Sequence, residues 1–398
     1  MDAGARAVTN SSVLPPRLPR ARPQSGIFLW TQPVQAGLSM NRRQVLCSFL
    51  AVPPSAILGF RQSTGLDPAG RFTTRDLAAP QEPTAGPTGL RSSPPLASRY
   101  DGQVFERLDI QARSGPALII THRNVTVRHC RIGHDNGYGV LADGARDFSL
   151  HDCEIEHTGA PPIGPARNPN CINLALNRCA GTRIFRLRAG RGSSNIYAIN
   201  SPYLTISTVE LHDARGPEPR GQNLQFDKCP SALLEDFSAE NSSSSWTEDN
   251  VSVFRSDNCR VRRGLVSYNN SPTGDGVMIE GSFDCSVEDV DAVQQGNGAF
   301  AAVPQGPSGS GNCSFIRCRT RDSYDSGRDG RAKPTSGGLS FYVKISSGAP
   351  PHRLIDCAYD KVANPGNLVW KREALAPGWS LVHTSFVPRP PIKLVFDW

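Results

Sequence analysis

The chain has 398 residues, of which 38% are hydrophobic and 7% aromatic, with 37 glycines and 33 prolines. This composition favours short strands divided by turns and argues against a fold of long amphipathic helices. The formal net charge is +7, but residues 1–60 contribute +5 of it and the remainder carries only +2, which argues against a nucleic-acid partner.

The first residues are predicted to be a leader. Residues 1–39 are interpreted as a non-native N-terminal extension, with Met40 as the true start. Residues 40–61 place Arg42 and Arg43 ahead of a short apolar run, which resembles a twin-arginine export signal. A chance arginine pair in a disordered cytosolic terminus is the alternative. On the first interpretation we expect a periplasmic or secreted protein.

Membrane anchoring is not expected. The apolar run after the arginines holds Pro53 and Pro54 and is shorter than the roughly 20 residues of a transmembrane helix. No integral membrane segment should therefore remain after signal removal. Residues 62–98 are rich in Pro, Ser, Thr and Gly, so they are expected to form a linker.

Residues 99–388 contain a repeat, with residues 389–398 as a C-terminal tail. An apolar anchor at position i is followed by small or apolar residues at i+3 and i+5, as in Val127, Cys130 and Ile132. Successive anchors are separated by 22 to 39 residues, mostly in the twenties, which is typical of stacked coils with insertions. The anchors are Phe105, Val127, Leu150, Ile184, Ile206, Leu234, Val261, Val287, Phe315, Leu354 and Leu381.

A second strand precedes the anchor strand in each central coil. Its two inward residues alternate with outward ones, and the second inward residue lies eight positions before the next anchor. This period of two predicts strands and not helices. The inward pairs are Val140/Ala142, Leu174/Leu176, Ile196/Ala198, Leu224/Phe226, Val251/Val253 and Val277/Ile279. The fold is therefore predicted to be an all-β, right-handed parallel β-helix, a single-stranded solenoid of about ten coils.

Two further series support stacking. Three positions before the anchor the chain repeatedly has Asn or Asp, residues that tolerate left-handed backbone in turns. This series comprises Asn124, Asp147, Asn258, Asp284 and Asn312. The 11 cysteines contain no C-x-x-C pair and recur at fixed places in the repeat, so they are expected to be reduced, buried packing residues and not zinc ligands.

The pattern of ladders across residues 103–388 resembles the pectate lyase and polygalacturonase superfamily. Glu248-Asp249-Asn250-Val251-Ser252-Val253 looks like the Asp-Asp-Cys-Val-Ala-Ile segment of polygalacturonases, and Gly274-Asp275-Gly276 occupies the place of their Gly-His-Gly. Two positions depart from the family: Asp275 replaces its His, and Gln222 stands where its third Asp is expected. The resemblance implies catalytic roles for Asp249 and Glu248. Asp275 is added as a catalytic residue because it is expected on the coil next to Asp249, with backbones roughly 5 Å apart.

Side chains between the inward pairs are expected to point to solvent and to form a polysaccharide groove beside the variable loops. Substrate binding is assigned there to a set chosen for charge, aromatic character or position. This set is Asp227, Glu280, Gln222, Trp246, Tyr197, Arg255 and Lys228. The alternatives are that Asp249 and Asp275 only cap turns, that Trp246 anchors its own loop, and that Arg255 and Lys228 pair with Asp227 or Glu280.

Three functions remain open. The favoured one is a glycoside hydrolase, because paired carboxyls supply an acid and a base. The second is a Ca²⁺-dependent polysaccharide lyase or uronate epimerase, with Asp249 and Asp275 as metal ligands. The third is a non-catalytic β-helix that binds glycan or builds a cell-surface structure. No cofactor is predicted apart from Ca²⁺ in the second case.

Overall fold

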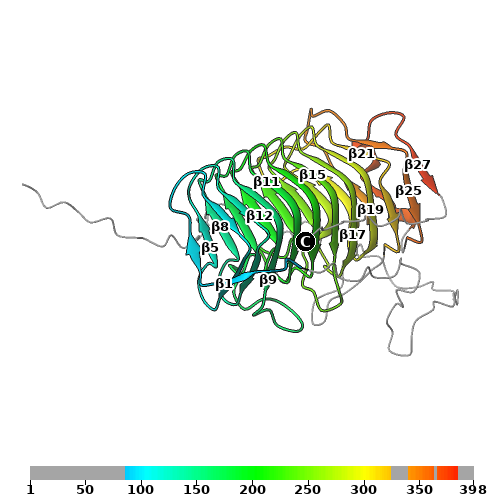
Figure 1. Ribbon diagram of the computed structural model, residues 1–398. Helices are drawn as coiled ribbons and strands as arrows, with labels where there is room; N and C mark the ends of the chain where they lie inside the picture. The colour runs from blue at the N-terminus through cyan, green and yellow to red at the C-terminus, as the bar shows by residue number, and fades with distance from the viewer. Residues whose placement is uncertain (1–85, 324–338, 363–364, 384–398) are drawn as a thin grey trace, which may run out of the picture. The chain divides into compact units, whose positions relative to one another are not determined.

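The computed structural model describes residues 86–323, 339–362 and 365–383, which form an all-β solenoid of parallel strands. Figure 1 shows the strands of successive coils lying side by side, from β5 and β8 to β25 and β27. Residues 1–39 and the predicted export signal at residues 40–61 lie outside the described residues. So do residues 384–398, which contain the expected end of the solenoid and the tail.

Within the described residues the strands form two sheets of 11 and 16 strands. The 11-stranded sheet contains β2 (Leu96–Ala97), β5 (Leu118–Ile120), β8 (Val140–Asp143), β10 (Leu174–Asn177), β12 (Ile196–Ile199), β14 (Leu224–Asp227), β16 (Val251–Phe254), β18 (Asp275–Glu280), β20 (Gly298–Val303), β23 (Leu339–Val343) and β26 (Val369–Trp370). The 16-stranded sheet contains β1 (Arg91–Ser93), β3 (Val104–Glu106), β4 (Leu108–Ala112), β6 (Thr126–Arg128), β7 (Arg131–His134), β9 (Ser149–His157), β11 (Arg183–Gly190), β13 (Thr205–His212), β15 (Leu233–Glu240), β17 (Arg260–Asn269), β19 (Ser286–Gln295), β21 (Ser314–Ile316), β22 (Arg319–Arg321), β24 (Arg353–Ile355), β25 (Cys357–Asp360) and β27 (Leu381–His383).

Two short 3-10 helices, η2 (Pro365–Asn367) and η3 (Arg372–Ala374), lie near the end of the described chain. No helix among the described residues is long and apolar enough to cross a membrane.

The predicted registers are confirmed in both sheets. Anchors pair with anchors, as Ile184 does with Leu150 and Ile206, and inward pairs stack on inward pairs, as Leu224 does on Ile196 and Val251. Residues that this register places side by side on successive strands are called a column below. Because each inward column is apolar and buried, a one-residue slip would expose the whole column, which fixes the register.

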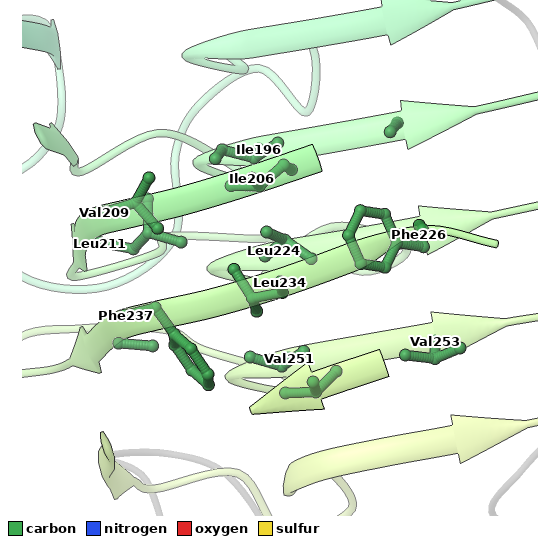
Figure 2. Packing of buried hydrophobic residues seen from close by; sticks show 14 of the residues in the cluster. Ile196, Ile206, Val209, Leu211, Leu224, Phe226, Leu234, Phe237, Val251 and Val253 are labelled. Carbon is green, nitrogen blue, oxygen red and sulfur yellow. The ribbon is translucent and has the colours of Figure 1, made fainter. Parts of the chain in front are cut away.

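The core lies between the two sheets. Leu224 and Phe226 of β14 face Leu234 and Phe237 of β15, and all four side chains are buried (Figure 2). Gly264 pairs with Phe237 in the neighbouring coil, and a Cβ at Gly264 would lie 2.1 Å from the Phe237 ring. The glycine therefore makes room for the largest side chain in its column.

A bend divides each anchor strand, and the residue two positions after the anchor has left-handed backbone. This series comprises Arg107, His129, Asp152, Arg186, Thr208, Asp236, Arg263, Asp289, Arg317 and Asp356, with φ between 49° and 56°. The predicted Asn and Asp turn series is left-handed too, with φ from 53° to 58°. The ten cysteines in the described residues are free and buried, as expected.

The structure corrects two boundaries. β1 and β2 lie inside the expected linker, but Arg91 pairs with Leu108 and Leu96 with Leu118, so the solenoid begins before residue 99. Strands of three and two residues are too short to display the repeat. At the other end Leu381 pairs with Cys357, not with the anchor Leu354, so the last expected copy is displaced by three residues.

Candidate active site

The outer face of the 11-stranded sheet has the predicted columns but not the predicted exposure. Tyr197 pairs with Gln225 in one column and Ile199 with Asp227 in the next. Tyr197, Asp227 and Met278 are nevertheless buried. The expectation that these side chains point to solvent is therefore wrong, because neighbouring groups cover them: Met278, for example, packs against Tyr342 and Val303.

Asp227, at the end of β14, is the centre of a polar cluster on this face. Its side chain is only 5% exposed. The Tyr197 hydroxyl donates a hydrogen bond to Asp227 Oδ2 at 3.3 Å, from the neighbouring strand β12. The Arg220 guanidinium lies 4.1 Å from the centre of the Tyr197 ring. These three side chains form what we call the Asp227 cluster.

Burial sets the electrostatics of the cluster. It raises the pKa of Asp227 above its ordinary value, although Lys228, Tyr197, Arg255 and Arg220 each act to lower it. Burial likewise raises the pKa of Tyr197 to about 12, against the opposing effect of Arg220. The tyrosine therefore remains a hydrogen-bond donor at neutral pH, and burial favours the neutral form of the Asp227 carboxyl more than water does.

A second carboxyl shares the column of Asp227. Asp227 pairs with Phe254, and Phe254 pairs with Glu280 on β18. Two strand spacings separate the two acidic residues, which is about 10 Å between backbones. Phe254, which lies between the two carboxyls in the column, is partly exposed, whereas Glu280 is only 4% exposed.

The acidic residues that the sequence analysis assigned to catalysis form hydrogen bonds between coils. Asp249 and Asp275 lie on adjacent coils, as expected, but each is only 1% exposed. Asp249 Oδ1 accepts the Asp275 backbone N–H at 2.9 Å, which is a bond between adjacent coils and not a cap within one turn. Asn297 Nδ2 lies 3.5 Å from Asp275 Oδ1.

Glu248 also forms hydrogen bonds between coils. Its side chain is buried and accepts hydrogen bonds from Thr273 Oγ1 at 3.0 Å and Ser271 Oγ at 3.3 Å. Gln222 is buried in the preceding coil, where its Oε1 accepts the Ser194 hydroxyl at 3.0 Å. The structure therefore places Asp249, Asp275, Glu248 and Gln222 in inter-coil bonding.

The remaining predicted binding residues lie at the margin. Trp246 is half-buried, and its backbone N–H donates to Ala214 O at 2.9 Å, so it is fixed to the neighbouring loop. Lys228 and Arg255 are exposed. Neither forms an ion pair with another described residue, and Arg255 lies 4.6 Å from the Phe254 ring centre. The alternative in which Lys228 and Arg255 form ion pairs with Asp227 or Glu280 is therefore not met among the described residues.

Calcium finds little support in the described part of the chain. No group of three or more His, Cys, Asp or Glu side chains there is placed to hold a metal ion. Asp249 and Asp275 therefore lack a further acidic ligand among these residues, whereas Ca²⁺ takes six to eight oxygen ligands.

Two features escaped the sequence analysis. Arg220 lies in a loop whose conformation the repeat does not determine, and its backbone N–H donates to Pro217 O at 2.8 Å. A buried asparagine ladder runs along the corner before the inward pairs, where Asn195 Nδ2 donates to Asn223 Oδ1 at 2.7 Å. The signal for that ladder was present, because Asn173, Asn195, Asn223 and Asn250 all precede the first inward residue.

The fold thus defines a parallel β-helix, the architecture implied by the resemblance to the pectate lyase and polygalacturonase superfamily. No family model matches the sequence, and no curated protein matches it significantly.

Solved structures share the architecture at low identity. The alginate lyase from Paenibacillus sp. str. FPU-7 has a TM-score of 0.43 at 7% identity, over 70% of this chain and 98% of that chain. A mannuronan C-5 epimerase A-module from Azotobacter vinelandii scores 0.44 at 11%, over 75% and 80%. The catalytic domain of a GH87 alpha-1,3-glucanase in complex with nigerose scores 0.37 at 8%, over 74% and 63%. These similarities concern the fold and not the chemistry of the site.

Proposed function

We propose that the protein is a carbohydrate-active enzyme, a glycoside hydrolase that acts on a polysaccharide at the outer face of the 11-stranded sheet. The observation that carries the proposal is the column Asp227, Phe254, Glu280, in which burial raises the pKa of the first carboxyl. The proposal retains the predicted reaction and moves its acid and base away from Asp249 and Asp275.

The two carboxyls would divide the work of hydrolysis. Asp227 donates its proton to the leaving oxygen, and Glu280 removes a proton from the attacking water on the opposite side of the sugar. Inverting glycosidases separate their carboxyls by roughly 6.5–9.5 Å to admit that water. A backbone separation of about 10 Å is consistent with this spacing, since side chains can lean toward each other. The expected product therefore has inverted configuration.

The other members of the Asp227 cluster position the acid. The Tyr197 hydroxyl orients the Asp227 carboxyl through the bond at 3.3 Å. Arg220 lies over the Tyr197 ring and holds it by a cation–π contact. Lys228 and Arg255, exposed beside the column, can contact anionic groups on the glycan.

A screen of soluble polysaccharides for new reducing ends tests this function. We expect cleavage of at least one glycan with inversion, and a loss of about 10²-fold or more in kcat for Glu280→Gln. Glu288→Gln, on the outer face of the other sheet, is the control and should retain activity. A product of retained configuration, or full activity of Glu280→Gln, would refute the assignment.

A second candidate is β-elimination or epimerisation of a uronate, favoured by the cations around Asp227. Arg220, Lys228 and Arg255 all affect the pKa of Asp227, and such a group of positive charges could neutralise a sugar carboxylate. Elimination would give unsaturated uronates that absorb in the ultraviolet, with no new saturated chain end on the non-reducing side. A glycan that binds and is never altered would leave the binding-protein alternative.

Export by the segment at residues 40–61 remains a prediction. Replacing Arg42 and Arg43 with Lys should retain the protein in the cytoplasm of a host with twin-arginine export. Unchanged distribution between cytoplasm and periplasm would contradict it.

A further inference from the structure

We propose that Tyr203 and Arg260 form a second saccharide-binding site, separate from the Asp227 cluster, that takes an acidic sugar unit. The site is a hollow of about 530 Å³ on the turn that leads from the 11-stranded sheet into the 16-stranded one. Its walls include Tyr203, Leu233, Asn258 and Arg260, so it spans three successive coils.

Tyr203 is out of place for the fold. It lies three positions before its anchor, in the column where most other coils have Asn, Asp, Gly or Ser in left-handed conformation and one coil has Pro351. Tyr203 adopts the left-handed conformation too, with φ of 60°. Bulky residues such as Arg186 and Arg263 share this conformation at the bends after the anchors, so what distinguishes Tyr203 is an aromatic side chain in this column.

The Tyr203 side chain is 68% exposed, so it contributes little to the core. Its backbone N–H donates to Pro230 O at 3.1 Å, which joins this turn to the next coil. An exposed aromatic ring offers a flat face to the apolar C–H side of a sugar.

Arg260 supplies the charge. It is exposed and forms no ion pair with a described residue. Arg262, two residues further along β17, is in contrast neutralised by Glu235, with Nε 2.8 Å from Oε2. The hollow therefore presents an uncompensated guanidinium, which favours a carboxylate or sulfate group.

The rest of the lining fits the same ligand. Leu233 provides an aliphatic surface, and Thr205, Ser231 and Asn258 provide hydroxyl and amide groups for sugar hydroxyls. Three strands span about 10 Å, enough for a short stretch of glycan. Only the choice of a saccharide as ligand rests on the proposed function.

Calorimetric titration of the full chain tests the inference. The protein carries Asp227→Asn to prevent turnover, and the probes are galacturonate and mannuronate hexamers, with cellohexaose as the neutral comparison. We expect a uronate hexamer to bind in a salt-sensitive manner. Tyr203→Asn should weaken binding roughly tenfold while the fold is kept, because Asn suits this column. Arg260→Gln should weaken it by about tenfold or more.

Matched controls share residue type and exposure but lie outside the hollow. Tyr100→Asn changes an exposed tyrosine of the first coil, and Arg183→Gln changes an exposed arginine in the same column as Arg260. Both should bind like the parent.

The outcomes separate the inference from the proposed function. Absence of hexamer binding, or binding that Tyr203→Asn and Arg260→Gln leave unchanged, overturns the inference even if wild type cleaves a glycan. Binding sensitive to both substitutions, in a protein that cleaves no glycan, supports the inference while the proposed hydrolase fails.

Discussion

Two buried carboxyls on opposite sheets have pKa values that are shifted in opposite directions. Asp152, on the 16-stranded sheet, accepts Arg186 Nη2 at 2.7 Å and lies 2.8 Å from His151 Nδ1. Burial acts to raise the pKa of Asp152, but the Arg186 and His151 hydrogen bonds outweigh it and hold the pKa below its ordinary value. Asp227 is about equally buried and has a raised pKa.

The difference lies in direct contacts. Asp152 is bonded by a guanidinium, whereas Asp227 has a tyrosine hydroxyl at 3.3 Å and cations that act only through the field. Direct contacts therefore act beside burial on the pKa of a carboxyl in this solenoid. Asp152 joins two coils, and under the proposed function Asp227 serves proton transfer.

The largest expected effect comes from Asp227→Asn. Loss of the proton donor should lower turnover by about 10²- to 10⁴-fold on any glycan that wild type cleaves. The fold should persist, because the amide is of similar size and can still bond Tyr197. Circular dichroism and steady-state kinetics check both parts. Normal turnover by a folded variant would place the acid elsewhere.

Asp152→Asn should lower the stability of the protein and leave its turnover unchanged. The substitution leaves Arg186 without its carboxylate, and we expect a cost of about 2 kcal/mol in the free energy of unfolding. Turnover at a temperature where the variant is folded should not change. Urea denaturation provides the measurement, and a variant as stable as wild type would contradict the contrast.

The pH dependence of stability should also differ between the two variants. The lowered pKa of Asp152 gives stability that is present above its unfolded pKa and lost as pH falls. The raised pKa of Asp227 gives stability that is present below its unfolded pKa and lost as pH rises through the folded value. The loss of stability at acid pH should therefore be smaller in Asp152→Asn than in wild type. The loss of stability at higher pH should be smaller in Asp227→Asn.

Tyr197→Phe is a smaller perturbation of the same carboxyl. The tyrosine hydrogen bond lowers the pKa of Asp227, so its loss should raise that pKa further. The alkaline limb of kcat/KM should therefore move to higher pH. Tyr342→Phe, on the same face but outside the cluster, should leave the limb in place. A shift toward lower pH would contradict the sign.

The smallest effect is expected from Arg263→Gln. Arg263 bonds Asp236 through Nε at 2.7 Å and Glu235 through Nη2 at 2.7 Å, and its side chain is 44% exposed. Exposed ion pairs contribute less than about 1 kcal/mol, so the melting temperature should change by a few degrees at most. A drop as large as that of Asp152→Asn would show that exposed and buried pairs contribute equally.

The sequence predicted the parts of this fold that repeat. Anchors such as Ile184 and Ile206, and inward pairs such as Leu224 and Phe226, were placed correctly because spacing and period two are local properties. The N-terminal end of the solenoid was placed too late in the chain, since β1 and β2 are too short to show the repeat. Leu381 was assigned to the anchor column by mistake. A single apolar residue fits the anchor position and the position three residues later equally well.

The site was less predictable than the fold. The column that joins Asp227 to Glu280 follows from register and was foreseen. The burial of Tyr197 and the approach of Arg220 depend on a loop without a repeat, so no spacing rule places them. Asp249 and Asp275 lie on adjacent coils as predicted, but Asp249 bonds the backbone of Asp275, which the spacing alone could not reveal.

The most direct test of the central claim is a pH titration of aspartate side-chain carbons by NMR, in wild type, Asp227→Asn and Asp249→Asn. Burial raises the pKa of Asp322 as well as that of Asp227, so the Asp322 resonance is first identified with Asp322→Asn. We predict a further resonance that titrates above the ordinary aspartate value of about 3.9. It should be absent from Asp227→Asn and present in Asp249→Asn. A raised resonance other than that of Asp322 that survives in Asp227→Asn, or none in wild type, would contradict the account.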